Sequence, residues 1–162
     1  MNISERDLRR CRDHLASIGT GTLLFGAWSV IKLNMELFVS KWEALETLPQ
    51  EKRWIGVLIL LVTDSFLSLV ILAWNLFVGV SARSEGLKGK KHVLYLILAA
   101  GMIVLYIPTV IGEIEYCSER FDNLGTGLVT VYVDLTIIVT LIELEYAAIK
   151  SRILQKKLMK QG

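Results

Sequence analysis

Three charged residues lie inside long apolar stretches of this sequence: Lys32, Asp64 and Asp134. A charged side chain near the centre of a bilayer costs roughly 2.5–3.5 kcal/mol on insertion scales, so each of the three needs compensation. Counting at about 1.5 Å per helical residue from the expected outer ends of the stretches places all three roughly 12–13 Å below the outer membrane boundary. We therefore expect the three side chains to meet if their helices face a common interior.

Two aspartates and one lysine leave an excess negative charge, which a proton, a bound cation or water in an outward-facing cavity would balance. Other polar residues share helical faces with these three, at successive spacings of four or seven residues. The residues that we expect to bind a ligand or a proton are Lys32, Glu36, Asp64, Ser68, Asn75, Thr130 and Asp134. The alternative is a buried ion pair with a protonated acid, which would only fix the register of the helices.

Four apolar stretches must position these residues, and they cover residues 15–39, 54–82, 93–112 and 124–149. Crossing the hydrocarbon core of a bilayer takes about 20 helical residues, so each stretch is long enough. Apolar residues make up 53% of the chain and the mean hydropathy is +0.51, a composition unlike that of a soluble domain. We predict an all-α, polytopic membrane protein with one membrane domain over residues 1–162, folded as an antiparallel bundle of four transmembrane helices.

Basic residues cluster before the first stretch, between the second and third, and after the fourth. The members of these clusters are Arg6, Arg9, Arg10 and Arg12, then Arg83, Lys88, Lys90 and Lys91, then Lys150, Arg152, Lys156, Lys157 and Lys160. The positive-inside rule places such clusters in the cytoplasm. We therefore expect a multi-pass protein of a cell or inner membrane with both termini cytoplasmic, and amphipathic helical extensions on that side at residues 4–14 and 150–160.

The segments between the stretches carry turn signals and interfacial aromatic residues. In the connection 40–53 we expect a short helix on the outer membrane surface, after which Pro49 starts the second membrane helix. Gly86 and Gly89 predict a tight cytoplasmic turn. Tyr95 is interpreted as an aromatic anchor at the inner interface.

The N-terminus and the two cysteines fit the same topology. A basic segment before an apolar run also occurs in signal peptides, but no small-residue cleavage site precedes Lys32, so we expect an uncleaved first helix. Cys11 and Cys117 fall on opposite sides of the membrane, and a disulfide between them is excluded by this topology. Cys117 is then free or pairs with another chain.

The sequence contains no signature of a known catalytic or cofactor site. Its two histidines, His14 and His92, lie at the cytoplasmic edge, where no pair within the spans can ligate a haem or a catalytic metal. C-x-x-C, H-E-x-x-H, G-x-S-x-G and Gly-rich phosphate motifs do not occur. We expect no catalytic residue, no metal or other cofactor, and no nucleic-acid partner.

The leading hypothesis is a small integral membrane protein whose outward-facing polar pocket binds or moves a small solute, an ion or a proton. Four helices barely enclose a pathway, so a homodimer is favoured, with Gly26 and Gly101 as candidate contacts. The first alternative is a non-catalytic accessory, immunity or regulatory subunit with a partner membrane protein. The second is a membrane enzyme acting on a lipid or a quinone.

Overall fold

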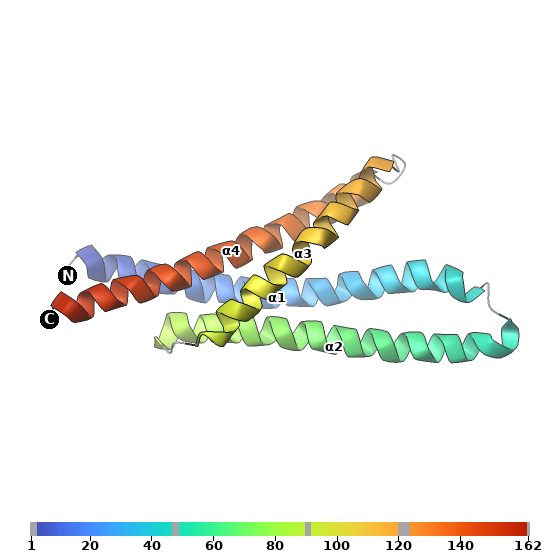
Figure 1. Ribbon diagram of the computed structural model, residues 1–162, viewed down its shortest axis with the longest axis horizontal. Helices are drawn as coiled ribbons and strands as arrows, with labels where there is room; N and C mark the ends of the chain where they lie inside the picture. Colours follow the sequence, from blue (N-terminus) through green and yellow to red (C-terminus); the bar gives the residue numbers. More distant parts are fainter. Residues whose placement is uncertain (1–2, 47–48, 90–91, 120–123, 162) are drawn as a thin grey trace. The chain divides into compact units, whose positions relative to one another are not determined.

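The computed structural model is all-helical over the residues it describes. The helices are α1 (Ile3–Glu46), α2 (Gln50–Lys88), α3 (Leu94–Glu119) and α4 (Leu124–Gln161) (Figure 1). The structure describes the backbone of residues 3–46, 49–89, 92–119 and 124–161, and the side chains of residues 5–35, 45, 49–89, 92–115 and 128–160. The predicted all-α class is confirmed.

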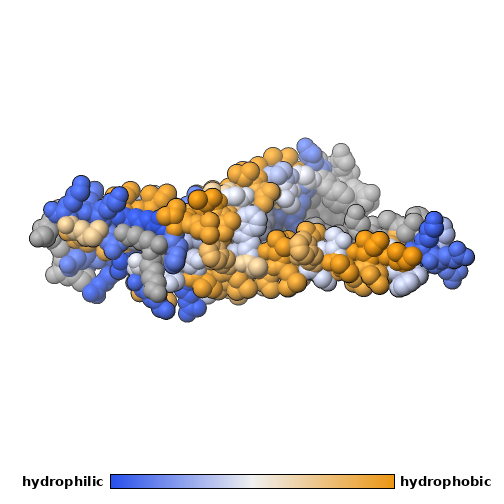
Figure 2. Space-filling model, turned by 60° about the horizontal axis from the view of Figure 1, so that its bottom comes forward, coloured by the Kyte–Doolittle hydropathy of each residue, from blue (hydrophilic) through white to orange (hydrophobic). Residues whose placement is uncertain are grey.

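Three of these helices contain a segment long and apolar enough to cross a membrane. Within the described part of the chain, these segments are Glu5–Met35, Gln50–Lys88 and Leu94–Glu115. Figure 2 shows apolar residues along the helices and hydrophilic residues near their ends. Membrane crossing by α4 and the cytoplasmic position of the termini stay predictions.

The helices continue past the apolar stretches at their predicted inner ends. The extension 4–14 belongs to α1 and the extension 150–160 belongs to α4, so each forms one continuous helix with the adjoining span. At the other end, the expected separate helix in the connection 40–53 is wrong, because α1 runs on to Glu46. Residues 40–46 contain no glycine or proline that would stop a helix.

Pro49 and Gly89 delimit α2 as their residue types predict. The carbonyl of Pro49 accepts hydrogen bonds from the N–H groups of Lys52 at 2.9 Å and Arg53 at 3.1 Å, which starts the helix. Gly89 has a φ of +67°, and its N–H donates to the carbonyl of Glu85 at 2.9 Å. This is a glycine C-cap, which favours residues without a Cβ.

The chain forms two compact units. The first, which we call the four-helix unit, comprises Met1–Thr22 and Phe77–Gly162, so it includes the first part of α1, the last part of α2, and α3 and α4. The second, the hairpin unit, comprises Leu23–Leu76, the remainder of α1 and α2. Candidate residues fall in both units.

The core of the four-helix unit uses one face of each helix. Its largest fully buried side chains are Leu15, Thr22, Val78, Tyr95, Asp134, Ile137, Leu141 and Leu144. The members of this set within α1 and within α4 are three, four or seven positions apart, which is the spacing of one helical face. The outward faces carry many exposed apolar side chains, including Leu87, Val104 and Tyr132.

Two glycines let α1 and α2 approach closely inside the four-helix unit. A Cβ built on Gly19 would lie 2.8 Å from the backbone of Gly79 and of Arg83. A Cβ on Gly86 would lie 2.6 Å from the carbonyl oxygen of Arg12 and 2.8 Å from the nitrogen of Ala16. Gly86, expected in the turn, therefore lies in the helix and serves contact between helices.

Gly86→Ala should destabilise the protein, because the new methyl group meets backbone atoms that cannot rotate away. Overpacking of this kind costs typically about 1–3 kcal/mol, against a gain of about 1 kcal/mol in helix propensity. Gly21→Ala is the matched control, since a Cβ at that position of α1 meets nothing within 4 Å. Thermal unfolding in detergent should show a lower Tm for Gly86→Ala and an unchanged or higher Tm for Gly21→Ala. Equal shifts would contradict the close contact.

Candidate functional site

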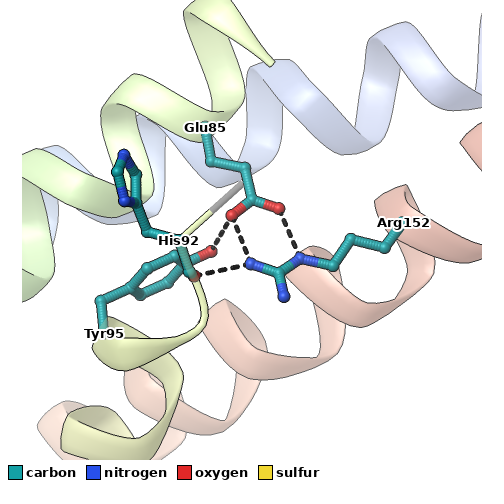
Figure 3. A network of polar contacts seen from close by, with 4 residues as sticks. All are labelled: Glu85, His92, Tyr95 and Arg152. Carbon is teal, nitrogen blue, oxygen red and sulfur yellow. Dashed lines mark hydrogen bonds and ion pairs between the residues drawn. The ribbon is translucent and has the colours of Figure 1, made fainter. Parts of the chain in front are cut away.

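A hydrogen-bonded network in the four-helix unit joins α2, α3 and α4 (Figure 3). The guanidinium of Arg152 donates from Nε to Oε1 of Glu85 at 2.7 Å and from Nη2 to Oε2 at 2.6 Å. Tyr95 donates its hydroxyl to the same Oε2 at 3.0 Å, and Nη2 of Arg152 also donates to the carbonyl of His92 at 2.7 Å. We call these four residues the polar clamp.

The local fold brings the members of the clamp together. Glu85 continues the buried face of α2 that contains Val78 and Ala82. The positive φ of Gly89 ends α2 directly afterwards, and Tyr95 lies in the first two turns of α3. Arg152 comes from the part of α4 that lies beyond its apolar stretch.

Burial and charge make the polar clamp a closed structure. The Glu85 side chain is 4% exposed and the Arg152 side chain 20% exposed. The hydrogen bonds that Arg152 donates to Glu85 raise the pKa of Arg152, although partial burial alone would lower it, so the guanidinium keeps its charge at any physiological pH. Both carboxylate oxygens of Glu85 accept hydrogen bonds from other members of the clamp, so the clamp is suited to hold helices together.

Sequence reasoning missed the polar clamp. Tyr95 was expected to anchor at the interface, yet it is fully buried. Arg152 was expected only as part of a basic cluster. One signal was present in the sequence: Glu85 is the single acidic residue between Asp64 and Glu113, and it falls in a basic connection.

Four of the predicted site residues have described side chains in the hairpin unit: Lys32, Asp64, Ser68 and Asn75. Lys32, Asp64 and Ser68 are half-buried. The Oδ1 atom of Asp64 is shielded from solvent and has no hydrogen-bond partner among the described residues. The side chain of Glu36, also on α1, lies outside the described residues.

Two interhelical contacts in the hairpin unit involve predicted residues. Ser68 accepts a hydrogen bond at 2.9 Å from the Nδ2 atom of Asn34, a residue that sequence reasoning did not single out. Asn75 is 3% exposed, and its side chain packs so closely on Gly26 that a Cβ there would lie 2.5 Å from the Asn75 Cβ. Gly26 thus has a partner within its own chain, and a dimer contact through it stays a prediction.

Asp134 and Thr130 belong to the four-helix unit. Asp134 is 1% exposed and lies on the buried face of α4 together with Val131, Ile137 and Leu141. Thr130, one turn earlier, is half-buried. Because Asp134 belongs to one unit and Lys32 and Asp64 to the other, their meeting stays a prediction.

The described side chains form no group of three or more His, Cys, Asp or Glu residues that could hold a metal ion. Comparisons with protein-family models, with curated proteins and with solved structures find no match to this chain.

Proposed function

We propose that the protein is a small integral membrane protein that binds or moves a proton or a small cation at acidic residues within its apolar helices. Asp64 is the residue most directly involved. The observation that carries this proposal is the shielded Oδ1 of Asp64, which has no hydrogen-bond partner among the described residues.

The physical reason is the free-energy cost of burying a carboxyl oxygen without a hydrogen bond. A polar group removed from water without a hydrogen bond costs about 1–3 kcal/mol by protein mutational data, and an isolated carboxylate costs far more. Asp64 lies near the middle of α2, inside the apolar segment Gln50–Lys88. A proton or a cation on the carboxylate would remove this cost, and intramembrane acids commonly mark such pathways.

Lys32 and Asp134 complete the proposed site. The lysine would hold an anionic group or one aspartate, and a proton on the second aspartate would change access to the pocket. Asp134, at 1% exposure, is shielded from bulk water and would depend on such a gated opening. Ser68, Asn75, Thr130 and Glu36 would supply polar contacts along the same route.

Ion binding can be tested by thermal unfolding of the purified protein in detergent. At a ligand concentration of 100 times Kd, binding to the folded state alone stabilises it by about 2.7 kcal/mol. The panel contains protons (tested by lowering the pH), Na⁺, K⁺, Mg²⁺ and small solutes. We expect one of the ions to raise the Tm of the wild type. Asp64→Asn should remove that increase, whereas Glu51→Gln, at an exposed acid in the first turn of α2, should keep it.

A second candidate function is supported by the polar clamp. Its bonds join helices to one another, as expected of a protein whose buried polar groups only fix its fold. Such a protein would act as a non-catalytic accessory or regulatory subunit. Purification in mild detergent would then recover one stable partner membrane protein in fixed ratio, and no ion or solute would raise the Tm of the chain alone.

A further inference from the structure

A groove lies between the first part of α1 and the last part of α4 in the four-helix unit, and none of its lining residues belongs to the proposed ion site. Its volume is about 470 Å³, within the range of about 300–1,000 Å³ typical of small-molecule sites. The residues that line it are Arg10, Cys11, His14, Glu143, Tyr146, Ala147 and Lys150. These residues belong neither to the proposed ion site nor to the polar clamp.

The charges of the groove favour an anion. Arg10 and Lys150 bring two permanent positive charges from two different helices. The one acidic residue in the lining, Glu143, lies 4.0 Å from Nε2 of His14, which places its charge beside the imidazole. Arginine and lysine are the side chains that commonly bind phosphate, and here one of each lines the same groove from a different helix.

The surroundings of the groove favour a lipid as the source of that phosphate. The groove is at the end of the apolar stretch 124–149, where the basic clusters predict the cytoplasmic headgroup region. Beside it on α4, Tyr146, Ile149 and Ile153 expose 64%, 51% and 50% of their surface, which would suit acyl chains. The Lys150 ammonium lies 5.4 Å from the centre of the Tyr146 ring, and this contact holds it next to the apolar surface.

We propose that this groove binds the phosphate headgroup of an anionic glycerophospholipid in the cytoplasmic leaflet. Arg10 and Lys150 would contact the phosphate. Glu143 and His14 would face the polar substituent of the headgroup, and Tyr146 would lie against the glycerol and acyl region. The site is independent of Asp64 and holds whether or not the protein moves ions.

Native mass spectrometry of the detergent-purified full chain, titrated with phosphatidylglycerol or phosphatidylcholine, tests the proposal. The double variant Arg10→Gln/Lys150→Gln removes both permanent positive charges of the groove and should bind phosphatidylglycerol roughly tenfold or more weakly. The matched control, Arg9→Gln/Lys156→Gln, removes the same charge from exposed positions of the same helices outside the groove. It should change binding by less than about twofold, because it leaves both basic side chains of the groove in place and exposed charges outside it are screened by salt.

Circular dichroism and Tm of each variant establish that it is folded, and the mutated residues are all exposed. Equal loss of binding in both double variants would overturn the proposal in favour of non-specific attraction. Equal binding of phosphatidylcholine and phosphatidylglycerol would overturn it as well. If soluble glycerol phosphate competed at the same concentration as phosphatidylglycerol, the ligand would be a free phosphate compound and the lipid assignment would be wrong.

Discussion

Arg152→Met should lower the free energy of unfolding by about 3–5 kcal/mol, the loss expected when one partner of a buried ion pair is removed. The effect is large because Glu85, which is 3% exposed, would be left with a buried charge and only the Tyr95 hydroxyl to bind it. The His92 carbonyl would lose its side-chain donor too. The measurement is equilibrium unfolding in mixed detergent, followed by circular dichroism.

Two variants separate this effect from a general loss of charge. Lys156→Met removes a positive charge from an exposed position of the same helix, and surface changes of this kind stay within about 0.5 kcal/mol. The double variant Glu85→Leu/Arg152→Met should be more stable than Arg152→Met alone, because it leaves no uncompensated carboxylate. If Arg152→Met unfolded like Lys156→Met, the polar clamp would make no net contribution to stability.

The helices could be predicted because they depend on local features of the sequence, namely runs of apolar residues and the proline and glycine residues at their ends. Each apolar stretch has at least about 20 residues, which suffices to predict a helix of membrane-spanning length. Pro49 and Gly89 act through their own backbone restrictions, so their positions at the ends of α2 could be read from the sequence. A change in hydropathy at residue 40 predicts that the first helix ends there, whereas α1 runs on to Glu46 because residues 40–46 contain no glycine or proline to stop it.

The polar clamp could not be predicted because it depends on residues far apart in the chain. Glu85 and Arg152 are separated by 67 residues, and their pairing requires the relative rotation of α2 and α4. Each residue alone fits an ordinary surface position in a charged connection. The hydrogen bond between Asn34 and Ser68 was missed for the same reason, since only the crossing of α1 and α2 makes Asn34 a partner.

For the predicted ion site, the sequence points to single residues, and the site itself stays a prediction. The apolar context of Asp64 indicates that burial of its carboxyl group costs free energy, and its Oδ1 is shielded without a hydrogen-bond partner among the described residues. The helical face that contains Asp64 and Ser68 also includes Asn75, which is buried against Gly26. Counting residues from the end of a helix estimates how deep a residue lies in the membrane, but not how one helix is rotated relative to another. For this reason it could not establish that Lys32, Asp64 and Asp134 meet.

Asp64→Asn should abolish ion movement while leaving the protein folded. The amide has nearly the shape of the carboxyl group, but it neither carries a negative charge nor releases a proton at physiological pH. Asp134→Asn should have the same effect if both acids serve one pathway. Glu51→Gln is the matched control, because it makes the same chemical change at an exposed position of α2.

The most direct measurement is ion flux into liposomes that contain the purified protein, driven by a proton or cation gradient and followed with an enclosed fluorescent indicator. The proposed function predicts flux with the wild type and with Glu51→Gln, and only the background of empty liposomes with Asp64→Asn. It is contradicted if Asp64→Asn carries ions as fast as the wild type, or if the wild type carries none across a broad panel while both aspartate variants are merely less stable.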